Sequence, residues 1–77
     1  MNQAILFNDD LQFNKQEDAW CFTGQLSGEH IIIFFHSMRL KKLSVIDNCT
    51  QFDLEEIAEQ WLENNEVENS VIHIQMK

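Results

Sequence analysis

The sequence predicts an α+β fold in which an antiparallel sheet carries two helices on one of its two faces. The approximate order of elements is β(3)-α(2)-β, in two layers. The prediction rests on aromatic and β-branched segments early in the chain, a helical apolar stripe over residues 54–62, and a polar/apolar alternation over residues 71–76. Strands followed by helices are typical of helices packed on one face of an antiparallel sheet. With 77 residues, the chain is expected to form a single small domain over residues 1–77.

Three strands are predicted in the first half of the chain. Residues 5–7 form the first, which the turn-forming residues Asn8-Asp9-Asp10 would end. The polar residues 14–18 separate it from a second strand over residues 19–23. The third strand, rich in Ile and Phe, runs from His30 to Phe35 or His36.

The second and third strands are expected to form a hairpin centred on Ser27-Gly28. In that register Trp20 lies opposite Phe35, and Phe22 lies opposite Ile33. Opposed residues of an antiparallel pair point to the same side, so we assign this apolar side to the core. The other side is mixed in character and is expected to be partly solvated; it pairs Cys21 with Phe34, Thr23 with Ile32, Gln25 with His30, and Ala19 with His36.

Two helices are predicted before the last strand. Ser37 can cap a short helix over residues 38–43, and residues 45–50 are expected to be a loop. Asp53, with Glu56 three residues later, is the expected N-cap of the long helix. Its apolar stripe follows the helical period and consists of Leu54, Ile57, Ala58, Trp61 and Leu62. Asn64-Asn65 would end this helix, and residues 71–76 would form a half-buried strand.

The charge balance limits the classes of partner. The formal net charge is −8, from 13 acidic and 5 basic residues. Because binding to a phosphate backbone needs Lys and Arg, we expect no nucleic-acid binding, whereas a basic protein partner agrees with the charge. The longest apolar run, residues 31–35, is far shorter than the ~20 residues that span a bilayer, so no membrane association is expected.

The cysteine content and the N-terminal segment favour a cytoplasmic protein. Cys21 and Cys49 are the two cysteines, whereas small secreted domains usually carry a denser set of disulfides. We therefore expect both to be reduced thiols. The first seven residues have neither the positive charge nor the long apolar stretch of a signal peptide.

Five short segments occur in an order that spans nearly the whole chain: Ile5-Leu6-Phe7, Trp20-Cys21-Phe22, Ile31–Phe35 running into Ser37-Met38-Arg39-Leu40, Phe52–Ala58, and Val71-Ile72-His73-Ile74. In this order they resemble the bacterial domain-of-unknown-function family 1488. The resemblance implies a two-layer β(3)-α(2)-β fold. It implies no activity and no functional residues, since the family has none assigned. Members often place a basic residue early in the long helix, where this chain has Asp53, Glu55 and Glu56.

No catalytic or cofactor-binding motif is present in the sequence. It has two glycines, too few for a phosphate-binding loop, and none of the metal-binding spacings CxxC, HxH or HExxH. We therefore expect neither enzymatic activity nor a cofactor. A small-ligand or metal-binding domain remains the alternative, using Cys21, His36 and His73 if the last strand lies beside the third.

Three surfaces are candidates for protein interaction. One is an apolar patch on the outer sheet face, the second an acidic stripe on the long helix, and the third a basic group on the short helix. Each also has a simpler interpretation: residues 8–18 cover the apolar patch, the acidic stripe is a solvated face, and the basic group locally neutralises an acidic molecule. The leading hypothesis is a non-catalytic interaction or regulatory module, with a homodimer left open. The candidate residues are Ile32, Phe34, Glu55, Glu59, Glu63, Arg39 and Lys42.

Overall fold

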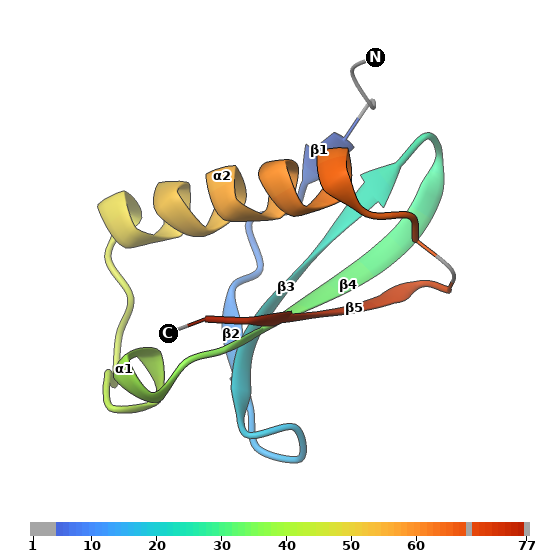
Figure 1. The fold of residues 1–77 in the computed structure, drawn as a ribbon. Coiled ribbons are helices and arrows are strands. Elements are labelled where there is room, and N and C mark those ends of the chain that lie inside the picture. Colours follow the sequence, from blue (N-terminus) through green and yellow to red (C-terminus); the bar gives the residue numbers. More distant parts are fainter. Residues whose placement is uncertain (1–4, 68, 77) are drawn as a thin grey trace.

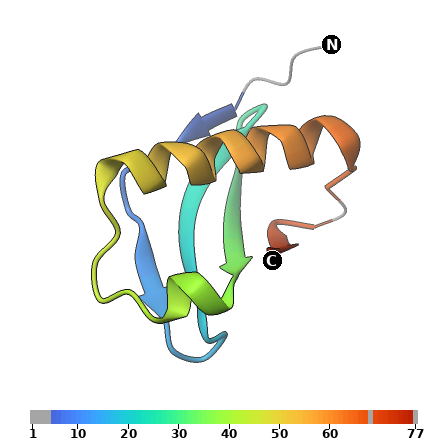
Figure 2. The same ribbon diagram turned by 60° about the vertical axis from the view of Figure 1, so that its left-hand side comes forward.

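A long helix crosses one face of a twisted five-stranded sheet, and a short helix lies near one end of the same face (Figure 1; Figure 2). The structure is a computed structural model that describes residues 5–67 and 69–76. Its elements, in chain order, are β1 (Ile5–Phe7), β2 (Gln12–Asn14), β3 (Ala19–Leu26), β4 (Glu29–His36), α1 (Met38–Lys41), α2 (Asn48–Asn64) and β5 (Val71–Gln75). The predicted α+β class is confirmed. Within the described residues, neither helix has the length and apolar character to cross a membrane.

The hairpin of β3 and β4 has the predicted register. Trp20 pairs with Phe35, Phe22 with Ile33, and Leu26 with Glu29. The two turn residues, Ser27 and Gly28, both have positive φ angles, of 52° and 87°. This left-handed turn follows the right-handed twist of the two strands, which is why short hairpin loops favour it.

The sheet is mixed, which differs from the antiparallel sheet that we predicted. β5 pairs with β4 in parallel, with Ile72 beside Ile33 and Ile74 beside Phe35. The chain leaves the end of β4, passes through both helices on one face and returns to the start of β4 (Figure 1). A connection of this length and kind brings the next strand in parallel.

β2 was not predicted from the sequence. It pairs with the first half of β3, and β1 pairs with the second half, so both lie along the same edge of β3. Between them, the carboxylate of Asp10 accepts a hydrogen bond of 2.9 Å from the backbone N–H of Thr23. One apolar residue, Phe13, anchors β2 by packing edge-on against Trp20, with ring centroids 5.7 Å apart. A three-residue polar strand with one apolar side chain leaves almost no periodic signal.

The helix boundaries differ from the prediction at the end of α1, which stops at Lys41 rather than at residue 43, and at the start of α2. Ser37 caps α1 as expected, because its side chain accepts a hydrogen bond from the N–H of Leu40. α2, however, begins at Asn48, so residues 48–50 are helical rather than loop. Asp47 is its N-cap and accepts a 2.8 Å hydrogen bond from the N–H of Thr50, which leaves Asp53 inside the helix. The helix ends at Asn64, as predicted.

The main core lies between the sheet and the helices. It joins the inward side chains of β3, β4 and β5 to those of α1 and α2, and its largest buried members include Phe22, Ile31, Ile33, Phe35 and Leu54. A second, smaller cluster lies on the outer face of the sheet and consists of Ala19, Cys21 and Phe34, with Ile32 packed beside it. The centre of the outer face is therefore buried rather than solvated.

Candidate functional site

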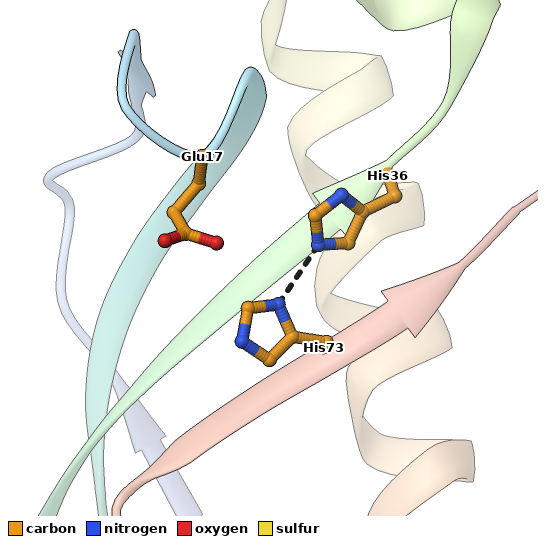
Figure 3. A group of neighbouring side chains, drawn as sticks. All are labelled: Glu17, His36 and His73. Carbon is orange, nitrogen blue, oxygen red and sulfur yellow. Dashed lines mark hydrogen bonds between the residues drawn. The ribbon is translucent and has the colours of Figure 1, made fainter.

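Two histidines meet on the outer face of the sheet where β4 and β5 lie side by side. His36 is the last residue of β4, and His73 is the central residue of β5. Because the strands are parallel and Phe34 is the partner of His73, His36 lies two pairs further along, on the same face of the sheet and diagonally across from His73. The Nε2 atom of His36 and the Nδ1 atom of His73 are 2.8 Å apart, a hydrogen-bond distance (Figure 3). The sequence left this approach open on the condition that the last strand lies beside the third, and β5 does lie beside β4.

Glu17 completes the group. It lies in the turn between β2 and β3, where its backbone N–H donates a 2.9 Å hydrogen bond to the side chain of Asn14. Its carboxylate faces the two imidazole rings (Figure 3). One ligand atom from each of the three residues lies within 4.8 Å of the other two. We refer to Glu17, His36 and His73 below as the histidine–glutamate cluster.

The surroundings of this cluster restrict its side chains. The ring of His73 stacks on the ring of Phe34, with centroids 5.0 Å apart and planes 13° from parallel. On the other side, the carboxylate of Asp18, next to Glu17, forms an ion pair with Lys41 of α1. The turn that carries Glu17 is thus tied to α1, and His73 rests on a buried aromatic ring.

Cys21 does not join the histidines, which corrects the predicted set of Cys21, His36 and His73. Its side chain is only 1% exposed and belongs to the small apolar cluster with Ala19 and Phe34. Burial, with a smaller contribution from the charge of Asp10, raises the pKa of its thiol. Within the described residues, Glu17 and not Cys21 is the third residue of the group. Its sequence signal is weak, because it stands in a polar turn among other charged residues.

The predicted apolar patch on the outer face is mostly covered. Phe34 is 6% exposed, and Ile32 is half-buried. The cover over Phe34 is the ring of His73, brought there by the parallel pairing of β5 with β4; the strand itself was predicted, but its direction beside β4 was not. Residues 31–35 therefore show no large exposed apolar surface.

The acidic stripe of α2, by contrast, is open and has an aromatic member. A shallow groove along the helix is lined by Phe52, Glu55, Glu56, Glu59, Gln60 and Glu63. Phe52 is 67% exposed. Phe52 was not among the residues predicted to form an interaction surface, although its position in the sequence could have revealed it. It lies two residues before Leu54, about 200° around the helix from the buried stripe.

The basic residues at α1 differ in whether they form an ion pair. Lys41 is engaged by Asp18, whereas Arg39 and Lys42 are exposed. Within the described residues, the Lys41–Asp18 contact is the one ion pair, so neither Arg39 nor Lys42 reaches the glutamates of α2. The predicted acidic surface of α2 and the predicted basic surface of α1 are therefore not linked by an ion pair within the described part of the chain.

Comparison with known proteins gives a relative but no activity. No family model matches the sequence, and the comparison with curated proteins found no match. The crystal structure of a protein of unknown function from Shewanella loihica PV-4, described as belonging to domain-of-unknown-function family 1488, superposes with a TM-score of 0.67. The two sequences are 30% identical, and the match covers 96% of this chain and 94% of the other. On this identity over nearly the full length of both chains, the protein belongs to domain-of-unknown-function family 1488.

Proposed function

We propose that this protein is a non-catalytic interaction module of the cytoplasm that presents the acidic face of α2 to a basic protein partner. The observation that carries the proposal is the exposed Phe52 side chain beside a row of glutamates that form no ion pair within residues 5–67 and 69–76. Aromatic side chains that become buried on binding often dominate the affinity of an interface. Charges around such an anchor select the partner and speed its association.

The glutamates of α2 also leave the free protein with unfavourable contacts. Glu55 and Glu59 are four residues apart, as are Glu59 and Glu63, and like charges at this spacing cost roughly 0.2–0.5 kcal/mol per pair. The helix has no lysine or arginine to offset them. A basic partner would remove this repulsion, which gives it an advantage over a neutral one.

The open helix face is a better candidate than the outer face of the sheet. Phe34 is covered by His73, whereas Phe52 is free of such cover. A second copy of the chain is also a weaker candidate than another protein. It offers few cations for four glutamates, because the chain has 5 basic residues and Lys41 is already paired.

Site-specific photocrosslinking tests the proposal. Phe52 is replaced by the photoreactive residue p-benzoylphenylalanine, which keeps an aromatic ring at the position, and the protein is irradiated in the cells that express it. Met38 of α1, 69% exposed, is the matched control position. We expect a crosslink from position 52, and none from position 38, to a protein with a basic segment at the site of attachment.

A pair of charge variants shows whether the glutamates contribute. Glu59→Lys/Glu63→Lys is combined with the photoreactive residue at position 52 and compared with Glu29→Lys/Glu66→Lys, which changes the net charge equally elsewhere on the surface. The crosslink should disappear in the first variant and persist in the second. Equal crosslinking in both, or a crosslinked product consisting of two copies of this chain, would overturn the proposal.

A further inference from the structure

We propose that Glu17, His36 and His73 form a binding site for one divalent transition-metal ion of the zinc type. The site lies on the outer face of the sheet, away from the α2 face, so it is independent of the proposed interaction. Two imidazole nitrogens and one carboxylate oxygen form a ligand set that suits zinc, nickel, cobalt or copper. Magnesium and calcium prefer oxygen ligands and should not compete for it.

The distances between the ligand atoms fit one ion after small side-chain movements. Zinc lies about 2.0–2.2 Å from nitrogen and oxygen ligands, so two ligands at a tetrahedral ion are about 3.4 Å apart. The histidine nitrogens are 2.8 Å apart, and no pair of ligand atoms in the cluster is separated by more than 4.8 Å. The rings need to separate by about half an ångström, and no other pair of ligand atoms needs to approach by more than about 1.4 Å.

The hydrogen bond between the rings shows which proton must move before a metal ion can bind between them. One of the two facing nitrogens must carry a proton for the bond to form. A metal ion between the rings requires a lone pair from each of them. The proton must then leave the facing nitrogen, which a neutral imidazole achieves by holding its proton on the other ring nitrogen. The ion would replace the hydrogen bond as the link between β4 and β5.

The backbone around the cluster already holds the three ligands in place. His36 and His73 lie on paired strands, and His73 is stacked on the buried Phe34. Glu17 is held through its own N–H by Asn14, and its neighbour Asp18 is paired with Lys41. That pairing offsets the positive charge of Lys41, which lines the same depression as Glu17 and His36 and would otherwise oppose a cation.

An ion at this position would join three segments that are distant in the sequence: the turn before β3, the end of β4 and the middle of β5 (Figure 3). With three protein ligands on an open face, the fourth position would be left to solvent or to an external ligand. Because only the folded chain assembles the three ligands, zinc should raise the melting temperature.

Native mass spectrometry and titration calorimetry with zinc chloride alone test the site. We expect one zinc ion per chain, a higher melting temperature in its presence, and at least a tenfold loss of affinity in His73→Gln and in Glu17→Gln. His30→Gln and Glu29→Gln remove an exposed histidine and an exposed carboxylate outside the cluster, and these variants should bind zinc as the unmodified protein does. Circular dichroism of each zinc-free variant separates loss of the site from loss of the fold.

Cobalt provides a second measurement that does not depend on stability. Cobalt bound in a tetrahedral site with nitrogen and oxygen ligands has an intense visible absorption, and we expect it with the unmodified protein but not with folded His73→Gln. Absence of zinc binding by the unmodified protein would overturn the proposal. So would equal losses of affinity in His73→Gln and His30→Gln.

Discussion

The indole N–H of Trp20, on β3, donates a buried hydrogen bond of 2.8 Å to the backbone carbonyl of Leu40, in α1. The same carbonyl accepts a second hydrogen bond from the N–H of Leu43. α1 is too short to be stable by itself, since isolated helices need about three turns or more. Its position therefore depends on Trp20, on the burial of Leu40 and on the Ser37 cap.

Replacing Trp20 by Phe removes this hydrogen bond and keeps an aromatic ring in the core. We expect the free energy of unfolding to fall by about 1–2 kcal/mol, from the lost hydrogen bond and the smaller buried volume. Urea denaturation measures it. Trp61→Phe is the control, because Trp61 is only half-buried and its indole makes no hydrogen bond within the described residues. Equal losses of stability in the two variants would contradict this role for Trp20.

Gly24 allows β1 to approach β3, and its replacement by Ala should detach β1. A Cβ atom at position 24 would lie 2.7 Å from the backbone carbonyl oxygen of Leu6. Because the obstacle is backbone, the strand itself must move, at a cost of about 1–3 kcal/mol. Hydrogen exchange should become faster for the amides of residues 5–7.

Gly28→Ala is the matched control for that experiment. A Cβ atom there meets nothing within 4 Å, but φ is +87°, so the cost is about 1 kcal/mol of local backbone strain. In this variant the amides of residues 5–7 should exchange no faster than the loss of global stability alone predicts. If Gly24→Ala exchanged like Gly28→Ala at these residues, the close approach of Leu6 would not be the cause.

The two cysteines should differ strongly in reactivity. Cys21 is buried, and this burial raises the pKa of its thiol, so little thiolate is present at neutral pH. Cys49 is exposed at the start of α2. We expect iodoacetamide to modify Cys49 rapidly in the folded protein and Cys21 only as fast as the protein unfolds. Mass spectrometry of tryptic peptides distinguishes the two positions, and rapid modification of Cys21 without denaturant would contradict the prediction.

The cap of α2 should make stability depend on acid. Hydrogen bonds from Thr50 lower the pKa of Asp47 in the folded protein, and the bond from the backbone N–H of Thr50 contributes more than the one from its side chain. The carboxylate therefore stabilises the fold fully above the pKa it has in the unfolded chain. This contribution is lost as the pH falls through the lower folded value. Asp47→Ala should lower the melting temperature at pH 7, and its difference from the unmodified protein should shrink toward pH 3.

Asp53→Ala is the control for the position of the cap. Asp53 lies inside α2, where alanine has the higher helix propensity, so this variant should not lower the melting temperature at pH 7. A larger loss in Asp53→Ala than in Asp47→Ala would place the functional cap at Asp53, as the sequence pattern alone suggested.

Much of the fold follows from local patterns. The apolar stripe of α2 and the left-handed turn at Ser27-Gly28 each depend on residues close in sequence, and both were predicted with their register. The start of α2 was predicted six residues late, because Asp53-Glu56 and Asp47-Thr50 both satisfy a capping pattern. In the structure α2 begins at Asn48, and Ile46, just before its N-cap, is half-buried against the core.

The candidate site depended on contacts that no local pattern contains. His36 and His73 are separated by 37 positions, and their meeting requires β5 to lie parallel to β4. Glu17 reaches them from a turn beside β3, a further strand away. The sequence by itself determined the elements, their inward faces and the acidic stripe, because side-chain periodicity and turn chemistry act over a few residues. Tertiary structure alone decided which polar side chains meet, because that depends on strand order and direction, which are set by how the helices pack on the whole sheet.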